Sequence, residues 1–296
     1  MSQYRPRLTE EEYRVVRAMK KGWRPDLSEM YEIDNEGNTK TPAKVLLFDV
    51  ETAPLRSYTW GLWKQNIQPD QIISDWFMLT WSAKWLFEDK VYSDGLTSRE
   101  AIAQDDKRIS QTIWKMINEA DIIIAHNANR FDVKKLNTRF LINGLMPPMP
   151  YQVIDTLDHL RKRFSISSNR LDYVNKILGL GRKIATGGFK LWDGCVKGDK
   201  TCLKHMEEYN RSDVMILEDT YLYIRPWIKP HPNMGLFIEE DIKVCPSCSS
   251  SDLIYGGTTY NTAACIYEAF RCGNCSSVGR NKKAIKDKST TRSIPR

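Results

Sequence analysis

The sequence predicts an α/β protein in which a layered domain with a mixed central sheet is followed by a small metal-bound module. Between residues 43 and 230, short apolar segments alternate with segments of helical periodicity, and strands interleaved with helices form such layered domains. Four of the seven cysteines stand near the C-terminus as two Cys-x-x-Cys pairs. This spacing is typical of a structural metal site in a reducing compartment rather than of a disulfide framework.

The first 42 residues predict one helix and an irregular arm. Thr9 to Glu12 has the Thr-Glu-Glu-Glu pattern of a capping box, so a helix is expected to follow it and to end near Gly22. Residues 25–43 contain clusters of Asp, Asn, Gly and Pro, which favour irregular structure. The arm leads into the layered domain.

Apolar runs predict five strands in the layered domain. The first is Val45–Phe48, and a long insertion rich in Trp and Pro separates it from the second. The others are expected, in chain order, at Trp76–Phe87, Lys90–Ser93, Asp121–Ala125 and Val153–Ile154. Because three strands follow one another before the first helix and two alternate with helices, the sheet should be mixed.

Apolar residues with a period near 3.6 predict five helices after the third strand. Their expected bounds are Ser98–Ala120, Asp132–Asn143, Leu157–Phe164, Leu171–Leu178 and Lys204–Tyr223. The residues expected on the buried faces of the first two helices are Ile102, Ile109, Ile113, Ile117, Val133, Leu136, Phe140 and Leu141. The stretch "GGFKLWDG" (187–194) before the last helix is expected to be a glycine-hinged loop.

Two carboxylates follow the first strand in "VLLFDVET", at Asp49 and Glu51. Side chains alternate along a strand, so these two share a face and lie about 7 Å apart by the rise per residue. Like charges at this spacing repel one another and resist joint ionisation. A divalent cation that prefers carboxylate oxygen would remove the repulsion. The pair therefore predicts a cation site at the end of the strand.

Two further acidic positions lie on later elements. Asp132 ends "HNANRFD", after an apolar strand and at the start of a helix, where a carboxylate either serves a ligand site or simply caps the helix. Tyr209 and Asp213 stand four residues apart within a predicted helix, so they share a face one turn apart. Alone, each of these positions also fits an ordinary structural or solvated residue.

In chain order, these motifs resemble the three exonuclease motifs of the 3′–5′ exonuclease superfamily with a ribonuclease-H-like fold. The third motif has a tyrosine four residues before Asp213. In this respect it resembles the branch called DEDDy, which has Tyr rather than His in that motif. "HNANRFD" and "VIDT" (153–156) resemble the exonuclease domains of family B DNA polymerases. The resemblance covers roughly residues 43–227, and with no polymerase domain in the sequence a stand-alone nuclease is expected.

The resemblance implies a two-metal phosphodiesterase. In family terms, two Mg²⁺ or Mn²⁺ ions would be held by Asp49, Glu51, Asp132 and Asp213, and Tyr209 would orient the nucleophilic water. This donor set suits these ions better than zinc. His126 falls where a structural residue usually sits. The residues expected to contact substrate are Thr52, Asn127, Phe131 and Lys190.

The two cysteine pairs predict one structural Zn²⁺ in a zinc ribbon. Cys245, Cys248, Cys272 and Cys275 would supply four thiolates around a closed tetrahedral site, with strand-like segments between the pairs. A redox pair would instead open a helix, and no such helix is expected. Cys195, Cys202 and Cys265 are expected to be ordinary thiols. Four aromatic residues of this module would either stack on bases or form the core of the ribbon: Tyr255, Tyr260, Tyr267 and Phe270. For Phe270, packing in the core is favoured.

The net charge of +7 is concentrated at the two ends of the chain. Residues 281–296 carry six Lys or Arg and one Asp, and residues 1–24 carry seven Lys or Arg and three Glu, which leaves a body of −2. Basic ends around an acidic body suit a polyanion held over a metal site, and they also suit a role in solubility alone.

These features predict five segments: a helix and arm at 1–42, a ribonuclease-H-like exonuclease domain at 43–230, a Pro-rich linker at 231–242, a zinc ribbon at 243–280 and a basic tail at 281–296. The expected enzyme is a 3′–5′ exonuclease acting on single-stranded or frayed 3′ ends of DNA and releasing nucleoside 5′-monophosphates. The alternatives are an endonuclease or RNA-trimming nuclease on the same fold, and a non-catalytic nucleic-acid-binding protein.

Nucleic acid is the expected partner, with DNA favoured over RNA, and the ribbon also suits docking of replication or repair proteins. No apolar run is long enough to span a bilayer, and the polar start lacks the apolar centre of a signal peptide. A cytoplasmic location is therefore expected. A small nuclease without a polymerase would also suit a virus such as a phage, in which case the location is the host cytoplasm.

Overall fold

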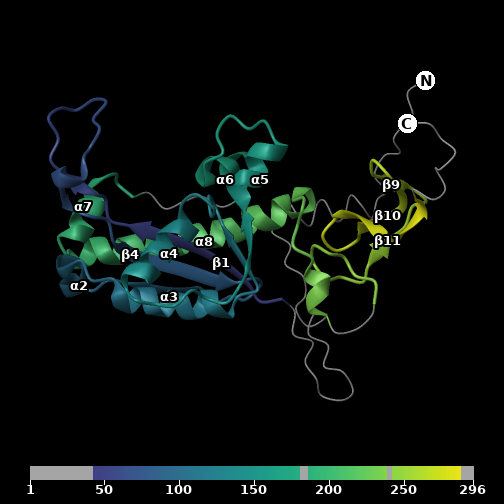
Figure 1. Ribbon diagram of the computed structural model, residues 1–296, viewed down its shortest axis with the longest axis horizontal. Helices are drawn as coiled ribbons and strands as arrows, with labels where there is room; N and C mark the ends of the chain where they lie inside the picture. Colours follow the sequence, from purple (N-terminus) through teal and green to yellow (C-terminus); the bar gives the residue numbers. More distant parts are fainter. Residues whose placement is uncertain (1–42, 181–185, 239–241, 288–296) are drawn as a thin grey trace, which may run out of the picture. The chain divides into compact units, whose positions relative to one another are not determined.

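The computed structural model describes residues 43–180, 186–238 and 242–287 (Figure 1). The helix expected after Thr9 and the arm that follows it lie outside these described residues. The chain divides into two compact units, one formed by Lys44–Thr220 and the other including Tyr221–Arg296. Within the described ranges, no helix has the length and apolar character needed to cross a membrane.

The first unit is built on a five-stranded sheet with the order β5-β4-β1-β6-β7. Strand β1 lies at its centre, pairs antiparallel with β4 and parallel with β6, and β7 continues the parallel half. The bounds are β1 Val45–Thr52, β4 Met78–Trp85, β5 Tyr92–Gly95, β6 Ile122–Ala125 and β7 Gln152–Asp155. The expected strands and the mixed sheet are thus confirmed, with β1 longer than expected.

Helices pack on both faces of the sheet. Their bounds are α2 Ser98–Ala103, α3 Lys107–Glu119, α4 Asp132–Ile142, α5 Thr156–Arg163, α6 Leu171–Leu178, α7 Lys190–Val196 and α8 Lys200–Ile224. Side chains alternate along β1, so Leu46, Phe48 and Val50 join the core formed with α3 and α4. The opposite face of β1 carries Asp49, whose carboxylate accepts a hydrogen bond from a side chain of α8. The same alternation that builds the core therefore aims the acidic residues at α8.

The expected single helix over Ser98–Ala120 is wrong, because the chain breaks it into α2 and α3. Gln104 adopts a left-handed conformation (φ 58°) that ends α2. Asp106 is fully buried between the two helices, where it accepts hydrogen bonds from the Met78 amide (2.8 Å) and from the Arg139 guanidinium (2.7 Å). Satisfying this buried carboxylate fixes the break, and no local pattern in the sequence reveals a partner so distant along the chain.

Two residues expected on buried helix faces are in fact exposed. Ile102 is 66% exposed and Leu141 is 79% exposed. Ile102 follows the α2 register rather than that of α3, so the break removes it from the stripe that Ile109, Ile113 and Ile117 form in the core. Of the three remaining residues of the expected faces, Leu136 and Phe140 are buried, and Val133 is half-buried against the core.

The long insertion after β1 forms a small two-stranded hairpin. Strand β2 (Arg56–Ser57) pairs antiparallel with β3 (Ile72–Ser74), and the short helix η2 (Pro69–Gln71) precedes β3. Its tip exposes large apolar side chains, with Trp60 96% and Trp63 83% exposed. The insertion therefore adds no side chain from its tip to the core.

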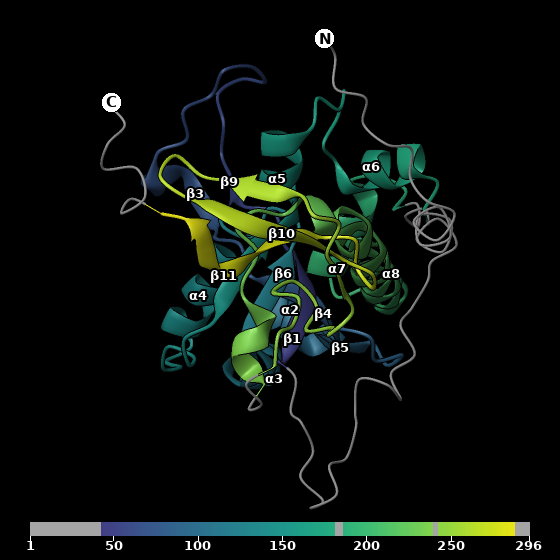
Figure 2. The same cartoon turned by 90° about the vertical axis from the view of Figure 1, so that its right-hand side faces the viewer.

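The second unit contains a small four-stranded sheet in which β10 pairs with β8, β9 and β11 (Figure 2). The bounds are β8 Leu253–Ile254, β9 Thr259–Asn261, β10 Ile266–Cys272 and β11 Val278–Lys286. Strand β11 continues through the first residues of the segment expected to be a basic tail, so Lys282, Lys283 and Lys286 lie on a strand. Short 3₁₀ helices, η3 (Arg225–Trp227) and η4 (Met234–Phe237), precede this sheet.

Within the expected Pro-rich linker, the described residues 231–238 are folded within the second unit rather than extended. Met234 is buried, and its amide donates a 2.8 Å hydrogen bond to the Pro246 carbonyl beside the first cysteine. The Tyr221 hydroxyl lies 2.9 Å from the His231 Nε2 atom. Proline fixes φ but does not prevent such packing, so proline content alone is a poor guide to an extended linker.

A buried ion pair attaches α8 to the sheet of the first unit. The Lys84 Nζ atom on β4 lies 2.7 Å from both carboxylate oxygens of Glu218 on α8, and both side chains are almost fully buried. Glu218 also accepts a 3.0 Å hydrogen bond from the Phe87 amide. Because a buried charge is costly without its partner, this pair fixes where α8 lies on the sheet.

We expect Glu218→Gln to lower the free energy of unfolding by about 3–5 kcal/mol, because it leaves the Lys84 ammonium buried without a counter-charge. Urea denaturation of the full chain measures the loss. The matched control is Glu119→Gln, which breaks the exposed Lys44–Glu119 pair and should cost less than about 1 kcal/mol. Adding Lys84→Met to Glu218→Gln should restore part of the stability. Equal losses for the two Glu→Gln variants would contradict the anchoring role of Glu218.

Candidate active site and cysteine cluster

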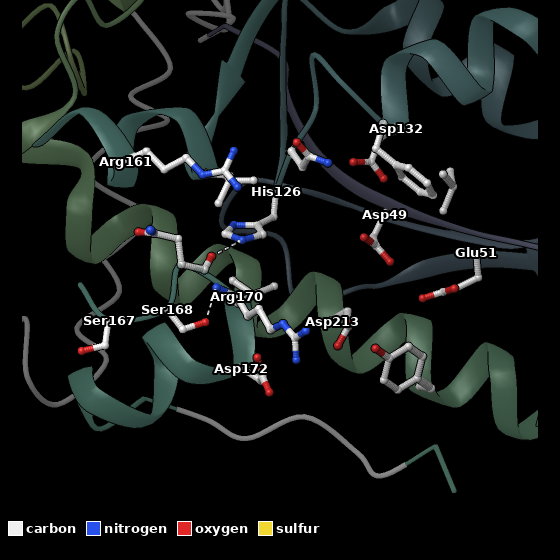
Figure 3. Close-up of a pocket in the computed structure, with 17 residues that line it drawn as sticks. Asp49, Glu51, His126, Asp132, Arg161, Ser167, Ser168, Arg170, Asp172 and Asp213 are labelled. Carbon is white, nitrogen blue, oxygen red and sulfur yellow. Dashed lines mark hydrogen bonds between the residues drawn. The ribbon is translucent and has the colours of Figure 1, made fainter. Parts of the chain in front are cut away.

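A cleft of about 670 Å³ lies at the carboxyl ends of the central strands of the first unit (Figure 3). Strand β1 contributes Asp49 and Glu51, the loop after β6 contributes His126 and Asn127, and α8 contributes Tyr209 and Asp213. The parallel strands β1, β6 and β7 all end at this edge of the sheet. Ligand sites in such sheets commonly lie at this edge, where the chain leaves the strands in divergent loops.

Three carboxylates converge in this cleft. One oxygen from each of Asp49, Glu51 and Asp213 lies within 4.8 Å of the others. Asp49 and Glu51 are half-buried and Asp213 is buried, so water screens their repulsion only in part. Because three like charges at this spacing are unfavourable, their donor set and geometry fit a hard divalent cation.

Asp132 lines the same cleft from the first residue of α4. It is 2% exposed, and its Oδ2 atom has no hydrogen-bond partner within the described part of the chain. Burial raises the pKa of Asp132 to about 8, against opposing amide hydrogen bonds, and the nearby carboxylates of Glu51 and Asp155 raise it further. Phe131, and not Asp132, occupies the N-cap position of α4, so Asp132 is not the N-cap of this helix. A cation bound here would take the place of the proton.

Asn210 is a residue of the site that sequence reasoning missed. It lies on α8 next to Tyr209, is fully buried, and its Nδ2 atom donates a 2.6 Å hydrogen bond to the Asp49 Oδ2 atom. This bond fixes the orientation of the Asp49 carboxylate. The signal was present in "YNRSD", where a buried amide stands within the same helical turn as the tyrosine and the aspartate.

Asp155 is a second residue that sequence reasoning did not assign. Its carboxylate accepts hydrogen bonds from the Asn127 and Asn129 amides, each at 3.0 Å, and from the Leu157 and Asp158 amides that begin α5. One side chain at the end of β7 thus caps a helix and shapes the loop after β6. Asn127 has a left-handed conformation there (φ 81°), which an asparagine tolerates better than most residues do.

His126 has both ring nitrogens engaged in hydrogen bonds. Its Nδ1 atom lies 2.9 Å from the Thr156 Oγ1 atom, and its Nε2 atom lies 2.9 Å from the Asn169 carbonyl oxygen. The ring therefore joins the end of β6 to α5 and to the loop before α6. This arrangement agrees with the expected structural role rather than with a general base.

The expected substrate-binding residues divide into two groups. Asn127 and Phe131 line the cleft, and Phe131 is 38% exposed. Among the described residues that line the cleft, neither Thr52 nor Lys190 appears. Lys190 begins helix α7, so the expected loop over 187–194 is wrong beyond its two glycines, which have φ values of 71° and 82°. The neighbouring Trp192 packs against the core.

Two arginines in the cleft were not expected. Arg161 lies in the last turn of α5 and Arg170 is the residue before α6, and both side chains line the cleft (Figure 3). Ser167 and Ser168 line it from the same connecting segment. The Arg-Lys-Arg run at 161–163 shows a concentration of positive charge in the sequence. Only the fold places Arg161 of this run in the cleft with the carboxylates.

The four expected cysteines cluster in the second unit. One sulfur from each of Cys245, Cys248, Cys272 and Cys275 lies within 4.8 Å of the others, and all four residues are buried. Two sulfur pairs, Cys245–Cys275 and Cys248–Cys272, are 3.6 Å apart. Ligands about 2.3 Å from a tetrahedral centre lie about 3.8 Å from one another, so the cluster is compatible with a zinc ribbon.

The two Cys-x-x-Cys turns repeat the same hydrogen bonds. Ser249 donates its amide to the Cys245 carbonyl (2.8 Å) and Ser276 donates its amide to the Cys272 carbonyl (3.0 Å). Both serines have left-handed backbones, with φ values of 61° and 60°. The sequence shows this repeat as "CPSCSS" and "CGNCSS". Phe270 is 5% exposed, in agreement with the expected core position, whereas Tyr255 is 37% exposed.

A family model and solved structures are similar to part of this chain. A family model described as RNase_H superfamily matches residues 87–224. No curated protein matches the chain. Among solved structures, the family B DNA polymerase from the hyperthermophilic archaeon Pyrobaculum calidifontis aligns with 63% of this chain at 18% identity and a TM-score of 0.47. This chain covers 25% of that polymerase.

The family match spans the segment from β5 to the end of α8, and it includes Asp132, Tyr209 and Asp213. Strand order β5-β4-β1-β6-β7, with the last three strands parallel, completes the architecture. The matched residues and the mixed five-stranded sheet of the first unit are those of a ribonuclease H-like fold.

Proposed function

We propose that this chain is a metal-dependent 3′–5′ exonuclease that hydrolyses DNA from single-stranded or frayed 3′ ends and releases nucleoside 5′-monophosphates. The observation that carries the proposal is the convergence of Asp49, Glu51 and Asp213 in one cleft with buried Asp132. Tyr209 lines the same cleft one helical turn before Asp213. The similarity of the motifs to exonuclease domains of family B DNA polymerases favours DNA.

The four carboxylates would hold divalent cations, Mg²⁺ or Mn²⁺, and the orphaned Oδ2 atom of Asp132 supports this assignment. When bound, such cations neutralise the charge that develops on the phosphate oxygens and make water a stronger nucleophile. Asn210 keeps the Asp49 carboxylate in place through its 2.6 Å hydrogen bond. One of the crowded carboxylates therefore already has a fixed orientation before an ion binds.

Hydrolysis transfers the terminal nucleotide to water. The Tyr209 hydroxyl orients the water, whose oxygen attacks phosphorus while its proton passes to solvent. The bond between phosphorus and the 3′ oxygen breaks, and that oxygen takes up a proton to leave as the new 3′ hydroxyl. Phe131, 38% exposed at the rim, offers a face on which the terminal base can stack.

The second unit is proposed to bind one zinc ion through its four cysteines and to hold substrate. Three lysines on β11 (Lys282, Lys283 and Lys286) supply charge for phosphate contacts. Arg280 on the same strand lies over the Tyr267 ring at 3.6 Å, which presents a flat cationic surface. Docking of a replication or repair protein is the second use that this module would suit.

The test of the whole proposal is the product pattern from a 5′-labelled single-stranded DNA incubated with Mn²⁺. A ladder that shortens from the 3′ end supports an exonuclease. Internal cuts would instead support an endonuclease, and retarded DNA without cleavage would support a binding protein. A parallel RNA substrate separates the RNA-trimming alternative.

Replacing either Asp49 or Asp213 by Asn should lower the cleavage rate at least roughly 1,000-fold, because each removes a proposed metal ligand. The melting temperature should stay the same or rise in metal-free buffer, since repulsion within the cluster falls. The control Asp158→Asn removes a carboxylate outside the cleft and should keep the parent rate. Near-parent cleavage by both site variants would refute the assignment.

Tyr209→Phe should slow cleavage by roughly 10- to 1,000-fold, because it deletes the hydroxyl that orients water and keeps the ring. Binding of a 3′-terminated oligonucleotide, measured by fluorescence anisotropy in EDTA, should barely change. If the variant cleaves as fast as the parent, then Tyr209 serves only packing.

Metal analysis of the full chain should find one zinc per molecule, and Cys272→Ser should lose it and unfold the second unit, since a module with so small a core depends on its metal. The matched control is Cys265→Ser, which alters a thiol outside the cluster and should retain zinc. Zinc-free parent protein with an intact second unit would contradict the ribbon.

A further inference from the structure

Two positive side chains in the cleft have no assigned task in the proposed chemistry. Within the described part of the chain, neither the Arg161 nor the Arg170 guanidinium forms an ion pair or hydrogen bond. By contrast, Arg108 binds Asp94 and Glu100, and Arg139 binds Asp106. An unpaired guanidinium that lines a cleft is available to an anionic ligand.

The backbone that carries these arginines is held in place by the site itself. Asp155 caps the start of α5, which ends with Arg161 in its last turn. The His126 ring holds the Asn169 carbonyl at 2.9 Å, immediately before Arg170. Both cations are thus fixed relative to the ends of β6 and β7, so only their side chains need to be ordered when a ligand binds.

The positions of the two arginines separate them from the proposed metal ligands. In Figure 3, His126 lies between Arg161 and the carboxylates of Asp49, Glu51 and Asp132. Arg170 reaches into the cleft from the start of α6, on the side of Asp213. A strand whose scissile phosphate lies at the carboxylates would therefore extend its next phosphate toward the arginines.

We propose that Arg161 and Arg170 form a subsite for the phosphate on the 5′ side of the scissile one, the second linkage from the 3′ end. The proposal rests on the nuclease function proposed above and specifies its substrate class: a strand with at least two phosphodiester linkages. Each guanidinium presents paired N–H donors that match phosphate oxygens, and the Ser168 hydroxyl in the same cleft adds a further donor. His126 acts as a positioning residue for this subsite.

The test compares two single-stranded DNA substrates that differ in one charge. In one, a neutral methylphosphonate replaces the second linkage from the 3′ end. For the parent protein, this replacement should raise KM roughly tenfold and leave kcat nearly unchanged. The double variant Arg161→Gln/Arg170→Gln should show the higher KM on normal DNA and less than a roughly twofold further rise on the methylphosphonate.

Two controls give the comparison its meaning. Lys162→Gln removes one positive charge next to Arg161, on an exposed residue that does not line the cleft, and it should behave like the parent protein. Binding of both substrates in EDTA, measured by anisotropy, should repeat the pattern without catalysis. A methylphosphonate penalty of the same size in the parent and in the double variant would overturn the subsite.

His126→Ala tests the positioning role. We expect it to reduce the methylphosphonate penalty to less than roughly threefold, because the segment before Arg170 is no longer held. A merely structural role would lower the melting temperature and kcat while leaving the penalty at its parent value, and that result would remove His126 from the proposal.

The outcomes also separate this subsite from the function on which it rests. If Asp49→Asn abolishes cleavage and the double arginine variant discriminates like the parent, the nuclease assignment stands and the subsite is wrong. If Asp49→Asn cleaves normally, the proposed active site itself is wrong, whatever the arginine variants do.

Discussion

Repulsion among carboxylates in one cleft is the constraint on which this structure depends. Asp49, Glu51 and Asp213 place oxygens within 4.8 Å of one another, and burial and its neighbours raise the pKa of Asp132 to about 8. A fold gains nothing in stability from this crowding. It persists because strands β1, β6 and β7 end at one edge and because α8 crosses that edge, so the arrangement points to a ligand that needs concentrated negative charge.

Helix α8 is held by polar contacts that differ in purpose. The Lys84–Glu218 pair, with its 2.7 Å contacts, lies beneath the helix and fixes its position on the sheet. The Asn210–Asp49 hydrogen bond joins the same helix directly to the carboxylate cluster. One contact therefore positions the helix and the other orients the Asp49 carboxylate, so the geometry of the cleft depends on both a buried charge pair and a buried amide.

The second unit differs from the first in what can stabilise it, because it has only a small apolar core. Its small sheet offers little apolar area, and the buried cysteine cluster stands where a larger domain would have a hydrophobic core. The repeated serine turns after each Cys-x-x-Cys pair satisfy the backbone around the sulfurs. Metal binding would then supply cohesion that burial cannot, and it leaves the strand surface of β11 available for its lysines.

The sequence by itself determined the elements whose signals are local: the five strands and their order along the chain, the helix α6 at Leu171–Leu178, the cysteine cluster and the three acidic motifs. Period, capping and spacing act over a few residues and can be read directly. Only the tertiary structure decided the break at Gln104, the helix at Lys190, the Asn210 contact and the two arginines in the cleft. Each of these depends on a partner tens of residues away, such as Asp106 with Arg139 or Asp49 with Asn210, and short-range patterns carry no record of such partners.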